Sequence, residues 1–387
     1  MPRKRLMTPG PTEVPEAALQ AMGRQVTHHR TPQFRALLAE VLEGLRYVLQ
    51  TESDVVLLAS SGTGGMEAAV TNLVPRGGKA LVLESGVFSR RWSDICRRYG
   101  IEVHTVAVPW GQAIPPAAVE QALGEHPDAV AVFGTLMESS TGTGHDIESI
   151  GRVVEASDSL FVVDGISGAG AMRCLTDAWN VDVLVVGSQK ALMVPPGLAV
   201  LSVSEAAWRQ MDRLQPQAFY FDLKLHRAKL AGPDTPWTPA HTLVAGLAES
   251  LRLIRAEGIE NVWQRCQRLA EMTQAGVVAM GLQVFSDRPA SGMTAVRLPV
   301  GIDAGQLLGR LEQRFGVKLA SGQLELKGRI FRIAHFGLID ELDIIATLAA
   351  IELVLDELGH PVTLGAAAAA ASRALRGAEH PQAVTSS

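Results

Sequence analysis

The sequence contains few of the residues that build disulfide frameworks and structural metal sites. Its three cysteines, Cys96, Cys174 and Cys266, lie far apart, and none belongs to a CxxC or Cys/His pair with metal-ligand spacing. This pattern argues against a disulfide scaffold and a zinc site, so we expect no metal. It also predicts a protein of the reducing cytoplasm.

An excess of positive charge and long apolar runs are also absent. The 35 Lys and Arg residues are outnumbered by 40 Asp and Glu residues, and the formal net charge of −5 argues against nucleic acid as a partner. No segment approaches the roughly 18 consecutive apolar residues of a membrane span. The basic start MPRKRL is followed by TPGPTEVPE and not by the apolar stretch of a secretory signal. We therefore expect no membrane partner.

Aromatic residues make up only 5% of the chain, whereas hydrophobic residues as a whole make up 47%. The 387 residues can therefore bury a large, mainly aliphatic core. A chain of this length is expected to form about two or three domains.

Short aliphatic runs alternate with helical patterns from residue 55 onward, as is typical of a largely parallel sheet with crossover helices. The runs are apolar almost throughout, so we expect the strands to be buried on both faces. The predicted strands cover residues 55–59, 80–84, 102–107, 129–134, 159–164, 181–187 and 198–203, and helices are predicted at 65–74, 89–99 and 147–155. The predicted fold class is α/β, with a mostly parallel seven-stranded sheet flanked by helices.

The pattern changes after residue 204. A loop rich in Pro and Trp leads into two long helical stretches, and a smaller α+β unit should follow them. We predict helices at 240–257, 261–280, 304–315 and 341–358, and strands at 293–298 and 329–334. The expected organisation is an N-terminal segment near the active site (1–20), a large domain (21–255), a small C-terminal domain (256–358) and an alanine-rich tail, helical or disordered (359–387).

The segment SSGTGGMEAAV (60–70) is a candidate phosphate-binding turn. It follows the first predicted strand and opens a helix, where free N–H groups and the positive helix end stabilise an anion. Small residues let the backbone approach such an anion closely. The same composition is also ordinary in tight turns, and it matches neither GxxxxGK[ST] nor a full GxGxxG. The segment alone therefore leaves both interpretations open.

Asp164 and Lys190 each follow a buried strand, in LFVVDGISGAG and VDVLVVGSQKALMVPPGLAVL. Because ligands bind at the carboxyl ends of parallel strands, we expect both side chains at one edge of the sheet. A capping or turn role is the alternative for Asp164. A phosphate cup, a carboxylate and an amine are the three protein groups that pyridoxal phosphate (PLP) needs. Together they predict a PLP site.

The chain resembles the class V aminotransferases of PLP fold type I, in particular the alanine–glyoxylate and serine–pyruvate or serine–glyoxylate group. The resemblance extends from about residue 6 to residue 358. It depends on the order of TPGPTEVP, SSGTGGMEA, ESSTG (138–142), VDGISGAGA, GSQKALMVPPG, TPWTP and GRIFRIAHFG. The resemblance implies a PLP-dependent transaminase that exchanges an amino group between a small L-amino acid, alanine or serine, and glyoxylate or pyruvate.

The resemblance also implies roles around the cofactor. Lys190 would be the catalytic Schiff-base lysine, and Asp164 would be the partner of the pyridine nitrogen. The remaining cofactor contacts would come from a residue beside the lysine, from the phosphate turn and from a contact to the ring: Gln189, Ser61, Gly62, Thr63 and Ser139.

Further positions are implied around the substrate and a second subunit. Arg332 would clamp the substrate α-carboxylate with its planar fork, and Gly10 belongs to a loop that would close over it. Phe88 stands where many relatives stack an aromatic ring on the cofactor, although a core Phe is the alternative. Thr238 would reach the phosphate of the neighbouring subunit, which implies a homodimer with shared sites. Thr235 stands where some members have a phosphate-binding Tyr.

Substrate choice stays open in the sequence. An aspartate donor is an alternative that is disfavoured, because no second Arg is obviously placed for a distal carboxylate, although Arg30 or Arg90 could serve. His28 or His29 is a candidate substrate contact. A cysteine-desulfurase-like lyase is disfavoured because no cysteine occurs between residues 301 and 387. A non-catalytic PLP-fold protein is a further alternative, whereas nicotinamide dinucleotide binding would leave Lys190 unexplained.

Overall fold

A computed structural model of the chain describes residues 3–215 and 217–379. Its centre is a seven-stranded sheet with the order β2-β10-β9-β8-β5-β3-β4. The strands are β2 (Asp54–Ala59), β3 (Lys79–Glu84), β4 (Glu102–Ala107), β5 (Ala129–Thr135), β8 (Leu160–Asp164), β9 (Val183–Gly187) and β10 (Leu198–Val203). β10 runs antiparallel to both of its neighbours, and the remaining pairs are parallel.

The predicted α/β fold class is confirmed. All seven strands lie where the aliphatic runs place them, and their ends differ from the predicted ones by at most two residues. The antiparallel direction of β10 carries no signal in the sequence, because an apolar strand buried on both faces looks alike in either direction.

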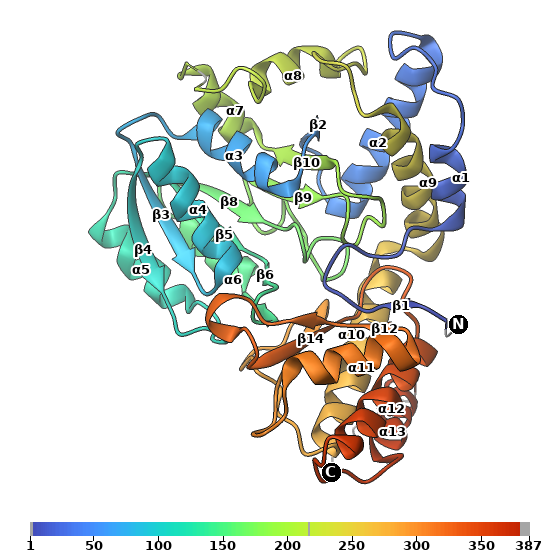
Figure 1. Cartoon of the computed structure of the whole chain (residues 1–387). Coiled ribbons are helices and arrows are strands. Elements are labelled where there is room, and N and C mark those ends of the chain that lie inside the picture. The colour runs from blue at the N-terminus through green and yellow to red at the C-terminus, as the bar shows by residue number, and fades with distance from the viewer. Residues whose placement is uncertain (1–2, 216, 380–387) are drawn as a thin grey trace, which may run out of the picture.

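Alternate residues of the strands face two separate hydrophobic layers. Val56, Val82 and Val162 pack on one layer, and their neighbours Leu57 and Leu81 pack on the other. Figure 1 shows the sheet enclosed between these helical layers. One layer holds α3 (Gly62–Leu73), α4 (Val87–Arg98), α7 (Glu205–Asp212) and α8 (Leu223–Leu230), and the other holds α2 (Pro32–Leu49), α5 (Pro116–Glu125), α6 (Ile147–Glu155) and α9 (His241–Glu257).

Two N-terminal helices were not predicted. α1 (Glu16–Met22) is short, and α2 begins at Pro32, inside the segment THHRTPQF (27–34). The signal for α2 is present, because Thr31 caps it by accepting from the N–H of Phe34 and a proline occupies its first position. α1 and α2 both pack against α9, so their stability depends on contacts with a helix that is far away in the sequence.

The C-terminal part is a smaller α+β unit. It contains α10 (Ile259–Ala279), α11 (Ala304–Phe315), α12 (Glu341–Glu357) and a sheet with the order β11-β14-β13, formed by Met293–Arg297, Ile330–Ala334 and Ala320–Ser321. β1 (Arg5–Leu6) pairs in parallel with β12 (Val317–Lys318) of this unit. The first residues of the chain therefore lie against its C-terminal part (Figure 1).

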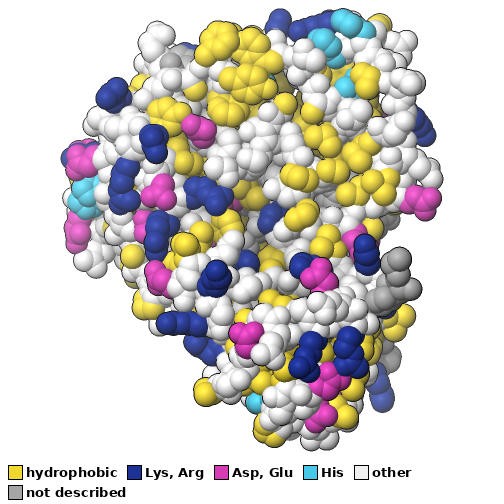
Figure 2. Space-filling view, in the orientation of Figure 1, with side chains coloured by type: hydrophobic (Ala, Val, Ile, Leu, Met, Phe, Trp, Pro, Cys, Tyr) yellow, Lys and Arg dark blue, Asp and Glu magenta, His cyan; other side chains and the backbone are white. Residues whose placement is uncertain are grey.

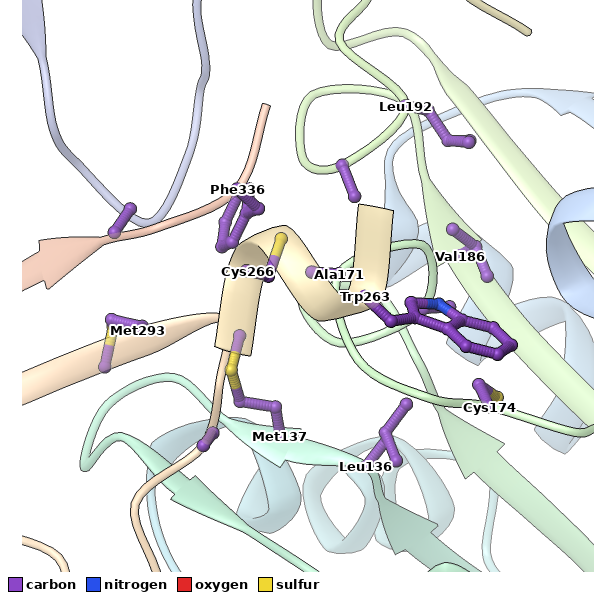
Figure 3. Close-up of a cluster of buried hydrophobic side chains, with 14 of the residues drawn as sticks. Leu136, Met137, Ala171, Cys174, Val186, Leu192, Trp263, Cys266, Met293 and Phe336 are labelled. Atoms are coloured by element: carbon purple, nitrogen blue, oxygen red, sulfur yellow. The ribbon is translucent and has the colours of Figure 1, made fainter. Parts of the chain in front are cut away.

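One hydrophobic cluster joins the large sheet to the C-terminal part. Figure 3 shows Trp263 and Cys266 of α10 among side chains from both regions. These neighbours are Leu136, Met137, Ala171, Cys174, Val186, Leu192, Met293 and Phe336. Because the apolar contacts are continuous, the strand ends of the large sheet and β14 are held in a fixed relation. No helix of the described residues is long and apolar enough to cross a membrane.

The alanine-rich segment forms α13 (Ala366–Glu379), which packs against α10 and α12. Its first turn is held by Glu352, a carboxylate that is 2% exposed on α12. Glu352 accepts from the N–H of Gly365 at 2.9 Å and from the N–H of Ala367 at 2.6 Å. A buried anion at the positive end of the helix thus fixes it in place. The expected tail also includes residues 380–387, which lie outside the described residues.

Replacement of Glu352 by alanine should release α13. Two charge-assisted hydrogen bonds are lost, so the free energy of unfolding in urea should fall by about 1.5–3 kcal/mol. Limited proteolysis should also begin to cut between residues 359 and 366. Asp356→Ala, at an exposed position of the same helix, is the control. Equal stability of Glu352→Ala and the control would show that the carboxylate does not hold α13.

Candidate active site

The carboxyl ends of four parallel strands, β3, β5, β8 and β9, meet at one edge of the large sheet. Lys190 follows β9 and Asp164 ends β8. Ser139 follows the short strand β6 (Met137–Glu138), which pairs with β7 (Thr143–Gly144) just beyond β5. The sheet topology therefore brings these three residues to one place, as the strand pattern predicts.

Lys190 lies directly under the N-terminal loop. Its ammonium nitrogen bonds to the carbonyl oxygen of Pro9, and the hydroxyl of Thr12 donates to its carbonyl oxygen at 3.0 Å. A Cβ atom on Gly10 would lie 2.5 Å from the Lys190 Nζ, and Gly10 has a φ of +111°. Both the space and the backbone conformation therefore require glycine at position 10.

The surroundings of Lys190 disfavour its charged form. Burial, together with the positive charges of Arg332 and Arg91, lowers the pKa of Lys190 to about 8, against the opposing effect of Asp164. A neutral amine is therefore much more accessible here than on an ordinary surface lysine.

Asp164 is also buried, with 5% of its surface exposed. Its Oδ1 accepts from the N–H of Ile166 at 2.8 Å. Burial, together with the nearby charge of Glu138, raises the pKa of Asp164 to about 7, against the opposing effects of the Ile166 N–H group, Arg91 and Lys190. The carboxyl group forms no ion pair within residues 3–215 and 217–379. It is thus placed to stabilise a cationic ring nitrogen.

The phosphate-turn candidate is the first turn of α3. Ser61 stands at its N-cap without using its side chain as a cap, so the N–H groups that begin the helix lack a side-chain acceptor. A Cβ on Gly62 would lie 2.5 Å from Ile166, and one on Gly65 would lie 2.8 Å from Val185. These glycines let the helix start close to β9. The helix begins at Gly62 and not near Gly65 as predicted, because the glycines themselves adopt helical geometry.

Arg332 and Ser139 lie in contact across the two parts of the chain. Arg332 on β14 donates from Nη1 to the carbonyl oxygen of Ser139 at 2.7 Å, and from Nη2 and Nε to that of Ser321 at 2.8 and 3.1 Å. The hydroxyl of Ser167 donates to that of Ser139 at 3.3 Å. Burial lowers the pKa of Arg332 to about 10, although Glu138 opposes the shift. Among the described residues, this guanidinium donates hydrogen bonds to carbonyl oxygens alone. Its positive charge therefore stays available to a carboxylate.

Glu138 fixes the start of α4, where Phe88 lies. Its fully buried carboxylate accepts from the N–H groups of Phe88 and Ser89 at 3.1 and 2.9 Å and from the hydroxyl of Ser140 at 2.6 Å. Phe88 is partly exposed and lies outside both hydrophobic layers, which argues against a core role. The guanidinium of Arg91 lies 5.0 Å from the centre of its ring.

Other predicted positions lie elsewhere. Thr238 lines a small pocket with Leu57 and Trp237, beside the edge of β2. Arg30 pairs with Asp234 at 2.6 Å and donates to the carbonyl oxygen of Thr235 at 3.0 Å. The rings of His28, which is exposed, and His29, which is half-buried, stack on one another with centroids 4.7 Å apart. None of these contacts links them to Lys190.

The sequence pattern did not identify Glu138, Arg91 and Thr12 as residues of the site. Glu138 had a signal, because a carboxylate directly after an apolar strand is costly to bury unless many donors meet it. Arg91 follows Arg90 in SRRW, and the helical pattern does not say which of the two faces the sheet edge. Thr12 depends on a contact 178 residues away in the chain.

These residues fit PLP. The side-chain oxygen Oε1 of Gln189, the residue before Lys190, is buried and has no hydrogen-bond partner among the residues that the structure describes. A buried acceptor of this kind is costly unless a ligand satisfies it. The free N–H groups of α3, the buried Asp164 carboxyl group and the Lys190 amine match the phosphate, pyridine nitrogen and aldehyde of the cofactor.

Comparisons with known proteins agree with this geometry. The model of the family described as Aminotransferase class-V matches residues 6–326. The chain is 40% identical to a protein of Synechococcus named soluble hydrogenase, small subunit, over 96% of this chain and 98% of that protein. It is 35% identical to L-aspartate–glyoxylate aminotransferase of Paracoccus denitrificans, over 96% of both chains. It is 34% identical to serine–glyoxylate aminotransferase of Methylorubrum extorquens, over 97% and 96%.

Solved structures show the same arrangement. Pyridoxamine–pyruvate aminotransferase from Mesorhizobium loti superimposes with a TM-score of 0.93, at 30% identity and over 97% of both chains. The predicted fold type, a mainly parallel sheet flanked by helices, is thereby confirmed.

Asp164→Asn should flatten the pH dependence of stability in protein freed of cofactor. The folded state holds the Asp164 proton more tightly than the unfolded state, since the pKa rises from 3.8 to about 7. The stability contributed by this proton is therefore complete below about pH 4 and is lost as the pH rises to about 7, by up to roughly 1.4 kcal/mol per pH unit.

Urea unfolding of both proteins across this range measures the difference. Asp158→Asn, at an exposed position, should follow the wild type. Parallel curves for Asp164→Asn and the wild type would contradict a protonated, buried Asp164.

Proposed function

The chain belongs to the aminotransferase class-V family, and from that premise we propose that it moves the amino group of L-alanine or L-serine to glyoxylate or pyruvate. It is a transaminase of the PLP-dependent type. The observation that carries the substrate proposal is that Lys190 shares its site with the Asp164 carboxyl group and the Arg332 guanidinium, whose charges both act on its pKa. An amine for proton transfer and a cation for an α-carboxylate are thus beside each other.

We infer that PLP is held by the residues that the site brings together. Asp164 would bind the pyridine nitrogen, Phe88 would lie against the ring, and Ser139 and Gln189 would contact its substituents. The first turn of α3, Ser61, Gly62 and Thr63, would bind the phosphate. When bound, PLP supplies an aldehyde that takes up the amino group and a protonated ring that withdraws electrons from the adjacent carbon.

Lys190 is the acid–base group of the reaction. Its lowered pKa provides a neutral amine that can accept the α-proton of the substrate and later return it, and a positioned group of this kind contributes about 10²–10⁴-fold in rate. Arg332 holds the α-carboxylate with two parallel hydrogen bonds. The loop of Pro9 and Gly10 covers the amine and limits the access of water.

Arg30 and Arg90, the two candidates for binding a distal carboxylate, both have acidic partners, which favours a substrate with a small, uncharged side chain. Arg30 is already paired with Asp234, and Arg90 lies 3.7 Å from Glu325. Neither arginine is free for a distal carboxylate in this arrangement. The relative named as an aspartate–glyoxylate enzyme keeps aspartate as the alternative donor. Glyoxylate and pyruvate are named as acceptors in the titles of relatives, which supports them here.

The cysteines give no support to a desulfurase or to an iron–sulfur function. Cys96, Cys174 and Cys266 are buried, and burial raises the pKa of each to about 12, so none is a ready nucleophile or thiolate ligand. The described residues also contain no cluster of His, Cys, Asp or Glu suited to a metal ion. The relative named as a hydrogenase subunit therefore suggests no second function here. Three free thiols fit a reducing compartment, and we propose the cytoplasm.

A homodimer is the proposed assembly. Large hydrophobic side chains are exposed around α8 and near α9, including Phe219, Tyr220, Leu225 and Leu253. Figure 2 shows hydrophobic side chains gathered on this upper part of the molecule. Thr238 lies in the same region, in the loop before α9, and would reach the phosphate in the partner subunit. Each of the two active sites of the dimer would then contain residues of both subunits.

Lys190→Ala should abolish transamination. We expect turnover of L-alanine with glyoxylate to fall by at least about 10²-fold, because the acid–base group is removed. Lys190→Ala should also lack the absorbance band that the cofactor gives when it is bonded to the lysine. Lys318→Ala, at an exposed position, is the matched control. Full turnover by Lys190→Ala would refute the assignment.

A panel of L-alanine, L-serine and L-aspartate against glyoxylate and pyruvate identifies the donor and acceptor. We expect a higher kcat/KM for alanine or serine than for aspartate, with the matching 2-oxo acids as products. A clear preference for aspartate would overturn the proposed donor class while leaving the role of Lys190 intact.

Sedimentation should give a mass of twice 41.3 kDa. Phe219→Asp should shift the protein towards monomer and lower its retention of PLP, because a charge would be buried in the interface. Val300→Asp, at a fully exposed position of the C-terminal part, should leave the dimer unchanged. A wild-type monomer with full activity would contradict the shared site.

A further inference from the structure

Arg91 is a cation without an acidic partner at the edge of the sheet where Lys190 lies. Its Nη1 donates to the hydroxyl oxygen of Thr63 at 2.9 Å. Among the residues that the structure describes, Arg91 forms no ion pair, whereas its neighbour Arg90 lies 3.7 Å from Glu325 and over the ring of Trp110. A guanidinium whose protein partner is a neutral hydroxyl keeps its charge and its other N–H donors available for an anion.

The position of Arg91 is fixed in advance. It lies in the second turn of α4, whose start is held by the buried carboxylate of Glu138. Its guanidinium is stacked over the ring of Phe88 at 5.0 Å, a favourable cation–π contact that limits its motion. The cost of ordering this long side chain has therefore been met before a ligand binds.

The positive charge of Arg91 acts on both Lys190 and Asp164. Its charge lowers the pKa of Lys190 and opposes the raised pKa of Asp164. Thr63 belongs to the first turn of α3, where the free backbone N–H groups also favour an anion. Two independent positive features, from α3 and α4, thus converge on the hydroxyl of Thr63.

We propose that Arg91 binds the phosphate of PLP together with the first turn of α3. This inference depends on the proposed cofactor site, and it adds a residue that the family resemblance did not assign. Because the Thr63 oxygen accepts from Arg91, the hydroxyl hydrogen is free to donate to a phosphate oxygen. The remaining N–H groups of the guanidinium can bind the phosphate directly. Arg91 therefore orients the hydroxyl group of Thr63 towards the phosphate and supplies its own N–H groups as further donors.

A distal carboxylate of the substrate is the competing ligand. Arg332, which is placed to hold the α-carboxylate, contacts Ser139 and Ser321, whereas Arg91 contacts the helix start that should receive the phosphate. The contact with Thr63 therefore favours the phosphate.

The test compares PLP with pyridoxal, which has the same ring and aldehyde but no phosphate. Dissociation constants for both are measured by absorbance titration of cofactor-depleted full-length wild type, Arg91→Gln and Arg91→Lys. The matched control is Arg98→Gln, at an exposed position in the last turn of the same helix. Thermal unfolding of each variant verifies that it is folded.

We expect Arg91→Gln to weaken PLP binding by about ten-fold or more, since a charge-assisted contact is lost. Pyridoxal binding should stay unchanged. Arg91→Lys should lose less, because it keeps the charge without the fork. Inorganic phosphate should compete with PLP less effectively in Arg91→Gln than in the wild type. Arg98→Gln should behave as the wild type.

Three results would overturn the inference. Equal weakening of PLP and pyridoxal would show a general effect on the site. Unchanged PLP affinity with a raised KM for aspartate alone would make Arg91 a substrate residue. Unchanged PLP affinity with no other effect would leave Arg91 without a role. If the wild type itself does not bind PLP, the proposed function fails as well, so the two failures are distinguishable.

Discussion

The action of a carboxyl group and two guanidinium groups on one buried amine is the interaction on which the rest of the site depends. Lys190 is placed at the end of β9, where Asp164, Arg332 and Arg91 all act on its charge. Burial alone favours the neutral amine, and the two arginines add to this effect, whereas Asp164 opposes it. The balance leaves the pKa of Lys190 at about 8, where both the charged and the neutral amine are accessible near neutral pH. An acid–base group needs such a balance.

This arrangement requires close approach of distant segments. The N-terminal loop reaches Lys190 only because position 10 is glycine, and β1 ties that loop to β12 of the C-terminal part. Arg332 reaches the site from β14, and the cluster around Trp263 and Cys266 holds that part against the large sheet. The site is thus assembled from the first residues, the sheet and the C-terminal unit. A change in the packing between these parts would move Arg332 relative to Lys190.

Much of the sheet could be predicted from the sequence, because its strands are continuous aliphatic runs with clear breaks. Asp164 and Lys190 were found for the same reason, since polar residues at the ends of buried strands stand out. The direction of β10 and the existence of α2 depended on distant partners. The roles of Glu138 and Arg91 were hidden for a different reason. A buried carboxylate needs donors from Phe88 and Ser89, some fifty residues away, and only the folded chain shows which of Arg90 and Arg91 lacks an acidic partner.

The role proposed for Lys190 is that of the amine that bonds to PLP. Borohydride reduction of the wild-type enzyme, followed by peptide mass mapping, identifies that amine, because reduction makes the bond between amine and cofactor permanent. We expect one pyridoxyl phosphate group, located on Lys190. A modification at another lysine, or no modification in protein that has been saturated with PLP, would contradict it.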